Sequence, residues 1–213
     1  MGKGFLGDGL RLAGEGDIEA VARIHLAAFD GFFLSQLGYR FLCLMYRAFL
    51  KSPSSLFVVF ETSSGQIVGF AVGALQGQKD RWLAFRYLPQ FMWAVVPAVL
   101  RHPVPVGKRL WARFSDAGES FQVPNGAGVL RSIGVLPSLR GAGVAASLLQ
   151  AFEALALIKG AGQVFLTTDE VNNGRAQRFY ARCGYELVTR FQQDEERGMW
   201  LMSKNLKRQI HEL

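Results

Sequence analysis

Cysteines are few in this sequence, and a long apolar segment is missing. The two cysteines, Cys43 and Cys183, lie far apart and lack the spacing of a zinc site, so we expect neither a disulfide framework nor a metal centre. The longest uncharged apolar run near the middle of the chain covers only residues 87–100 and contains two prolines. A membrane-spanning helix needs about 20 apolar residues. The sequence therefore predicts no transmembrane segment.

Export signals and acidic residues are also scarce. The first residues, MGKGFLGDGLRLAGEGD, lack the apolar core of a secretory signal, and together with the few cysteines this indicates a cytoplasmic protein. The formal net charge is +7, from 24 basic and 17 acidic residues. Residues 78–115 alone contain seven basic residues and one acid. Such a surface favours phosphate-bearing partners, but no nucleic-acid-binding motif accompanies it, so nucleic acid is not an expected partner.

Periodicity predicts one α/β domain over residues 1–213, with residues 78–125 as a basic, aromatic-rich helical insertion. Helices are expected after Asp17, which reads as an N-cap, and then over 39–50, 144–159 and 175–183. Strands are expected over 10–12, 55–62, 66–75, 128–135, 163–168, 185–191 and 198–206. The turn composition SSGQ makes an antiparallel hairpin of the second and third of these strands.

A glycine-rich turn precedes the third helix, in the stretch LRGAGVAASLL. Gly141, Gly143 and Ala146 fit a G-x-G-x-x-A dinucleotide fingerprint, with Asp169 about 20 residues later. However, LPSLR separates the strand from Gly141, and the remaining chain is too short for further βαβ units. A plain glycine turn that starts a helix is the other structural alternative.

Two motifs in order and in register resemble the GNAT superfamily of N-acetyltransferases. VLPSLRGAGVA resembles the family's acyl-CoA-binding motif R/Q-x-x-G-x-G/A, and NGRAQRFYARCGYELV resembles its second signature. The opening LRLAGEGDIEAVARIH is similar to the family's first strand and helix. The resemblance covers roughly residues 9–77 and 126–205. It implies a mixed, mostly antiparallel central sheet flanked by helices, with a helical insertion before the cofactor-binding strand.

The resemblance also implies an acyltransferase that moves an acetyl group from acetyl-CoA to a primary amine. Its cofactor-binding positions would be Ile133, Val135, Arg140, Gly141, Ala142, Gly143, Val144, Ala145, Asn173 and Tyr180. Glycines at a helix start let phosphates approach free N–H groups at the positive end of the helix dipole. We therefore expect a larger side chain at Gly143 to reduce cofactor affinity more than stability.

The catalytic groups are expected after the next strand. Tyr180 matches the tyrosine that faces the cofactor sulfur in the family, and we predict that it is the general acid. Many relatives carry a glutamate base where this chain has Val129, so the base is less clear. Asp169 is our preferred candidate, with Glu170 and Glu119 as alternatives. His25 falls in a helical pattern and is more consistent with packing than with catalysis.

The acceptor is not identified by sequence. By resemblance, the first two helices and residues 78–125 would form its pocket, with Phe29, Phe32 and Phe33 as candidate substrate contacts. An anionic amino sugar is one candidate acceptor. The insertion could instead contact lipid or a partner subunit, or simply extend the core, and a homodimer stays open. The alternative function is a catalytically weak CoA-binding or interaction module on the same fold.

Overall fold

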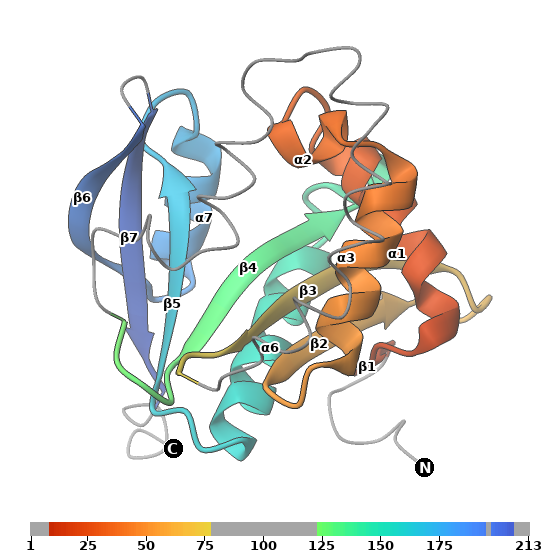
Figure 1. Ribbon diagram of the computed structural model, residues 1–213, viewed down its shortest axis with the longest axis horizontal. Coiled ribbons are helices and arrows are strands. Elements are labelled where there is room, and N and C mark those ends of the chain that lie inside the picture. The colour runs from red at the N-terminus through yellow and green to blue at the C-terminus, as the bar shows by residue number, and fades with distance from the viewer. Residues whose placement is uncertain (1–8, 78–122, 195–196, 207–213) are drawn as a thin grey trace.

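We analysed a computed structural model of the chain, which describes residues 9–77, 123–194 and 197–206. The insertion predicted over residues 78–125 therefore lies largely outside the described residues. A seven-stranded sheet with strand order β1-β2-β3-β4-β5-β7-β6 forms the centre of the structure (Figure 1). The strands are β1 Leu10–Leu12, β2 Ser55–Glu61, β3 Ile67–Leu75, β4 Gly128–Val135, β5 Gln163–Asp169, β6 Glu186–Asp194 and β7 Arg197–Asn205.

Only one neighbouring pair of strands is parallel. β4 and β5 run parallel, whereas all other neighbours in the sheet are antiparallel, including the predicted β2–β3 hairpin. This confirms the mixed, mostly antiparallel sheet flanked by helices. The parallel pair is connected by the long helix α6, as a crossover between parallel strands requires.

The helices pack on both faces of the sheet. They are α1 Ile18–Ala28, α2 Phe33–Gln36, α3 Tyr39–Lys51, α6 Val144–Ile158 and α7 Gly174–Arg182, with 3-10 turns η1 Glu15–Asp17 and η3 Pro137–Leu139. In Figure 1, α1 and α3 lie on one face of the sheet, and α6 and α7 lie behind it. Sequence periodicity predicted all of these helices except the single-turn α2, where we expected an irregular aromatic turn.

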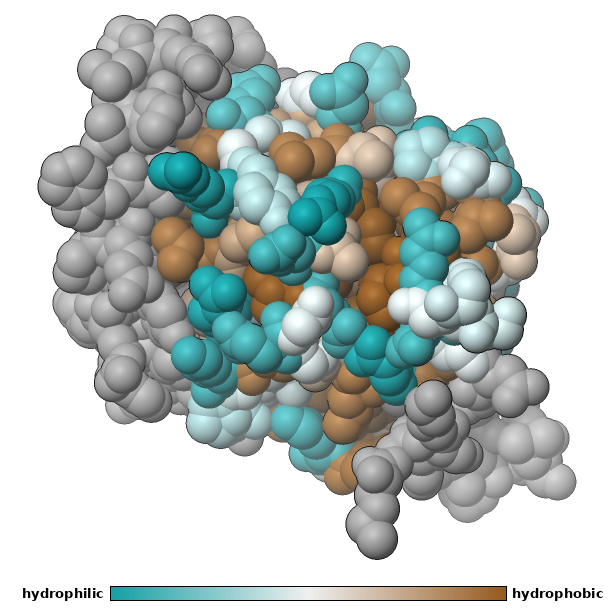
Figure 2. Space-filling view, turned by 90° about the vertical axis from the view of Figure 1, so that its right-hand side faces the viewer, coloured by the Kyte–Doolittle hydropathy of each residue, from teal (hydrophilic) through white to brown (hydrophobic). Residues whose placement is uncertain are grey.

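Two hydrophobic clusters hold these layers together. Under α6, the buried residues include Leu148 and Phe152 from the helix and Leu130 and Leu166 from the two parallel strands. Under α1 and α3, Ile18, Phe41 and Tyr46 pack with sheet residues such as Phe70. Outside this second cluster, hydrophilic side chains alternate with hydrophobic ones on the side of the molecule seen in Figure 2. The helices α1, α3 and α6 thus each bury one apolar side, as their sequence patterns predicted.

Asp17 was predicted as the N-cap of α1, and the structure confirms this position. It immediately precedes α1, but its side chain makes no cap hydrogen bond. Its carboxylate instead accepts hydrogen bonds from the backbone N–H of Gly14 at 2.8 Å and from Arg11, at 2.6 Å from Nη1 and 2.8 Å from Nη2. The charged neighbour on β1 therefore competes successfully with the helix end for this carboxylate.

Candidate active site

The parallel strands β4 and β5 separate along their length, which opens the sheet. They pair only from Gly128 to Leu130, opposite Val164 to Leu166. Beyond this point β4 continues to Val135 and β5 to Asp169 without pairing with each other. The backbone groups of residues 131–135 that face β5 can therefore bind an extended, amide-bearing ligand as an added strand would.

A β-bulge marks the place where the strands separate. Val72 on β3 pairs with Ser132 and Gly73 pairs with Leu130, so Arg131 has no opposite residue. A Cβ on Gly73 would lie 1.9 Å from the carbonyl oxygen of Val129, so only glycine fits beside the bulge. Bulges bend a strand and increase its twist, which here turns β4 away from β5. We did not predict the bulge, although a glycine inside an apolar strand was a signal for it.

The glycine turn leads from β4 into the N-terminus of α6. Gly141 has φ +91° and Gly143, the N-cap residue, has φ +82°, and no atom lies within 4 Å of a Cβ built on either residue. No side chain caps α6, and its first turn contains no acidic residue. The first N–H groups of a helix have no intrahelical acceptor. This turn is therefore an exposed site for an anion such as a phosphate.

The two positive φ values change the explanation that we gave for these glycines. The left-handed backbone itself costs a residue with a Cβ about 1–2 kcal/mol. A side chain at Gly143 would thus strain the turn as well as obstruct a ligand, so an effect mainly on affinity is no longer expected.

The predicted cofactor-binding residues surround this opening. Ile133 and Val135 pack towards α6, and Val144 is buried at the start of that helix. Ala142 is exposed and Ala145 is half-buried in the same turn. Arg140 is exposed, and its Nη2 lies 3.3 Å from the carbonyl oxygen of Ala28 at the end of α1. This contact joins the glycine turn to the α1–α2 loop.

Helix α7 is fixed to the end of β5 by two amide side chains. Asn173 occupies the N-cap position of α7, but its Nδ2 donates to Thr168 Oγ1 at 2.8 Å and its side chain does not cap the helix. Gln177 Nε2 donates to the carbonyl oxygens of Asp169 at 2.8 Å and Glu170 at 2.9 Å. Gln177 was not singled out from the sequence. Together these bonds hold α7 against the opening of the sheet.

Tyr180 lies on the inner side of α7 and is 9% exposed. Its ring contacts those of Phe179 and Tyr185, at centroid distances of 5.2 and 5.9 Å. Burial, with a smaller contribution from the charge of Cys183, raises the pKa of Tyr180 above its ordinary value. The side chain therefore keeps its proton at neutral pH and can donate it. None of the described residues forms a hydrogen bond with its hydroxyl.

The two carboxylates at the end of β5, Asp169 and Glu170, both form ion pairs. Asp169 makes a two-point contact with Arg197, with distances of 2.5 Å from Nε to Oδ1 and 3.0 Å from Nη2 to Oδ2. Glu170 Oε1 lies 3.3 Å from Arg190 Nη1, and its side chain lies over Gly198. Glu119 lies outside the described residues. Val129, at the position where relatives carry a glutamate, is buried in a small apolar cluster and offers no base.

A cavity of about 430 Å³ lies between the α1–α2 loop and the ends of β5 and β7. Its lining residues are Asp30, Gly31, Phe32, Phe33, Gln36, Asp169 and Arg197. The structure thus brings Phe32 and Phe33 together with Asp169 in one pocket, which we call the acceptor pocket. Phe29 does not line the pocket but lies next to it: its ring contacts the Phe32 ring at a centroid distance of 5.8 Å, packs against His25 at 4.7 Å and lies beside Gly134 of β4.

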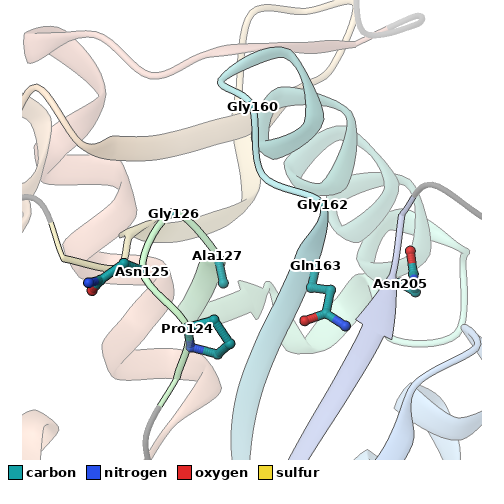
Figure 3. Close-up of a pocket in the computed structure, with 8 residues that line it drawn as sticks. All are labelled: Pro124, Asn125, Gly126, Ala127, Gly160, Gly162, Gln163 and Asn205. Carbon is teal, nitrogen blue, oxygen red and sulfur yellow. The ribbon is translucent and has the colours of Figure 1, made fainter.

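Other candidate features lie away from this opening. His25 is buried, and its Nδ1 lies 2.5 Å from the Tyr46 hydroxyl, which agrees with a packing role. A second hollow, of about 340 Å³, lies at the opposite ends of β4 and β5 (Figure 3). Glycines and amide side chains line it, and no titratable side chain is among its lining residues. No group of side chains suited to a metal ion occurs within the described ranges.

Comparison with known proteins identifies the class to which this fold and site belong. The family model for the acetyltransferase (GNAT) family matches residues 18–185. The chain therefore belongs to the GNAT family of acetyltransferases, and the protein is an acyltransferase. A search of curated proteins finds no match. In the part of the chain that the structure describes, no helix has the length and apolar character needed to cross a membrane.

Solved structures with the same fold share little sequence with this chain. An acetyltransferase structure is 22% identical with a TM-score of 0.61, covering 92% of this chain and 98% of that one. Chaetomium thermophilum Naa20, in complex with a bisubstrate analogue, is 21% identical with a TM-score of 0.57 and coverages of 95% and 88%. The Escherichia coli ribosomal-protein-S18-alanine N-acetyltransferase is 13% identical with a TM-score of 0.57, and both coverages are 92%. At these identities the likeness concerns the fold alone.

Proposed function

We propose that this protein transfers an acetyl group from acetyl-CoA to the primary amine of a small molecule bound in the acceptor pocket. The observation that carries the proposal is the opening between β4 and β5, which ends at the uncapped N-terminus of α6. An acyl-CoA consists of a phosphate-rich nucleotide and an arm with two amide groups. The glycine turn suits the phosphates, and the free edge of residues 131–135 suits the amides.

We assign the remaining cofactor contacts from where each residue lies relative to the glycine turn and the opening. Arg140 is exposed beside the glycine turn and can approach a phosphate if it releases the Ala28 carbonyl. Ile133 and Val135 offer backbone groups and apolar side chains to the arm. Asn173 uses its amide nitrogen on Thr168, so in our proposal its side-chain oxygen is the atom left for the ligand.

Three protons move in the reaction: the acceptor ammonium loses one before attack, the attacking nitrogen loses a second to solvent as the amide forms, and the departing sulfur gains one. The amine nitrogen attacks the thioester carbonyl carbon, a C–N bond forms, the C–S bond breaks, and the sulfur leaves as a thiolate. In our proposal Tyr180 protonates that thiolate, because burial keeps its hydroxyl neutral, and it regains a proton from solvent. Only about one alkylamine in a thousand is neutral at pH 7, so the acceptor must lose a proton before attack.

Asp169 is the base that we propose, since it lines the acceptor pocket and its described neighbour Glu170 does not. Its two-point contact with Arg197 fixes the orientation of the carboxylate and balances its charge. If Asp169 is the base, the Asp169→Asn variant will lose the acid limb of the kcat/KM profile. An unchanged limb would leave proton removal to water or to another group.

Release of free thiol from acetyl-CoA, measured with and without a primary amine, tests the proposal. We expect release that depends on the amine and saturates with both substrates. The alternative, a CoA-binding module with little turnover, predicts saturable acetyl-CoA binding and no thiol release that depends on an amine.

A further inference from the structure

Among the described residues that line the acceptor pocket, one carboxylate has no balancing charge. The charged side chains that line it are Asp30, Asp169 and Arg197. Asp169 and Arg197 neutralise each other through their two-point contact. Asp30 is exposed and forms no ion pair with any of the described residues. The described lining therefore carries one net negative charge, in a chain whose overall charge is +7.

The loop that presents Asp30 is held in place by its own hydrogen bonds. The Phe32 N–H donates to the carbonyl oxygen of Phe29 at 3.1 Å, and Ser35 Oγ donates to the same oxygen at 2.6 Å. Gln36 Nε2 donates to the carbonyl oxygen of Gly31 at 3.2 Å. Asp30 and Phe32 thus occupy a loop that its own hydrogen bonds hold in place, which lowers the entropic cost of binding.

In our proposal Asp169 takes the proton of the nitrogen that reacts, so Asp30 is left for a different group of the acceptor. An amine attacks only in its neutral form, whereas a carboxylate stabilises the protonated form. Among the described residues no cation pairs with Asp30, so in our proposal the complementary positive charge belongs to a second group of the acceptor. Phe32 is 45% exposed beside Asp30. Its ring can cover an apolar spacer or lie next to a cation.

We propose that the acceptor is a diamine, with one ammonium group bound by Asp30 and the other nitrogen acetylated. The inference rests on the proposed function and makes it specific. It replaces the anionic amino sugar considered from the sequence, because an anionic group would meet the unbalanced charge of Asp30.

Three amines of similar length test the proposal: pentane-1,5-diamine, n-hexylamine and 6-aminohexanoate. Hexylamine has a methyl group in place of the second ammonium, and aminohexanoate has a carboxylate there. We expect kcat/KM from thiol release to fall in this order. The diamine should exceed hexylamine by about fivefold, the effect of one exposed ion pair, after correction for its two equivalent ends.

Two variants test whether Asp30 causes the preference for the diamine. Asp30→Asn should reduce the corrected ratio of diamine to hexylamine to about one, because it removes the ion pair. The control is Glu19→Gln, which removes the same charge from an exposed acid that pairs with Arg23 on α1 and does not line the pocket. It should leave the ratio at its wild-type value.

Three results would overturn the proposal: an equal rate for diamine and hexylamine, a preference for aminohexanoate, or an unchanged ratio in Asp30→Asn. A large and equal loss with both amines, together with loss of the acid limb, would make Asp30 the base instead. Calorimetric binding of the three amines in the presence of CoA measures the preference without turnover. Preferential diamine binding without thiol release would keep this inference and contradict the proposed function, whereas equal binding would contradict the inference itself.

Discussion

Lys204 on β7 and Glu153 on α6 form a buried ion pair, with 2.7 Å between Nζ and Oε2. Both side chains are less than 10% exposed. The Tyr185 ring lies 5.9 Å from Lys204 Nζ. Neither the Tyr185 hydroxyl nor Glu153 Oε1 has a hydrogen-bond partner among the described residues. This pair connects α6 to β7, the strand that neighbours β5 in the sheet.

Removing one member of this pair should destabilise the fold strongly. Lys204→Met leaves a buried carboxylate without a partner, and we expect the free energy of unfolding to fall by about 3–5 kcal/mol in a urea titration. The exposed Glu19–Arg23 pair is the control, and Arg23→Met should cost less than about 1 kcal/mol. The double variant Glu153→Leu, Lys204→Met should recover most of the loss. Equal, small losses at both pairs would contradict the burial of Glu153 and Lys204.

Asp17 should make stability depend on pH in the acid range. Burial alone would raise the pKa of this carboxyl, but hydrogen bonds from Arg11 and from the backbone of Gly14, with the Arg11 charge, leave the pKa lowered. Because the pKa of Asp17 is lowered in the folded state, this carboxyl stabilises the protein at pH values above its ordinary pKa of 3.8. That contribution is lost as pH falls through the folded pKa.

Asp17→Asn tests this pH dependence. Wild type should lose stability relative to this variant between about pH 4 and pH 2. At neutral pH the wild type should be the more stable of the two. Parallel stability profiles across this range, measured by urea unfolding, would contradict the account.

Gly143 should matter both for stability and for binding of acetyl-CoA. Gly143→Ala places a Cβ at a φ of +82°, so we expect a loss of about 1–2 kcal/mol. It should also weaken acetyl-CoA binding by about tenfold or more, as expected when a charge-assisted hydrogen bond is disturbed. Calorimetry measures the affinity.

Gly160 provides a matched control at the other end of α6. Its φ is +90°, and a Cβ there would also meet no atom within 4 Å. Gly160→Ala should therefore cost similar stability and change acetyl-CoA affinity by less than about twofold. A similar loss of affinity in both variants would mean that strain, and not the ligand, explains the effect at Gly143.

Tyr180→Phe should reduce kcat by about 10²–10⁴-fold, the usual contribution of a general acid, with little change in KM for acetyl-CoA. Because burial raises the pKa of Tyr180, its deprotonation should not cause an alkaline limb of kcat below about pH 10. The control is Tyr185→Phe, which removes a buried hydroxyl beside Glu153 and should retain most of the activity. A Tyr180→Phe variant with wild-type kcat would contradict the acid role.

The regular elements could be predicted because their apolar residues repeat at helical or strand spacing. The β4 strand was predicted with its observed bounds, 128–135, and α6 with an error of one residue. Lys204 could also have been found, since strand alternation places it on the same buried face as Met202 and Leu206. A lysine at such a position requires a partner in the core.

The pairing of charges across the site could not be predicted. Arg197 follows Asp169 by 28 residues, and only the antiparallel contact of β5 with β7 brings their side chains together. The acceptor pocket likewise depends on the loop after α1 lying next to the end of β5. Phe32 and Phe33, which line this pocket, were candidates from the family resemblance, whereas a single exposed aspartate such as Asp30 carries no sequence signal.

Acetyl transfer to an amine at the opening between β4 and β5 is tested by quantifying both of its products in one reaction. Free thiol and acetylated amine are quantified together, the second by mass spectrometry, with acetyl-CoA and pentane-1,5-diamine as substrates. We expect equal amounts of both products, formed at a rate that depends on the amine and falls sharply in Tyr180→Phe. Saturable acetyl-CoA binding with no acetylated amine, and thiol release no faster than without amine, would contradict it.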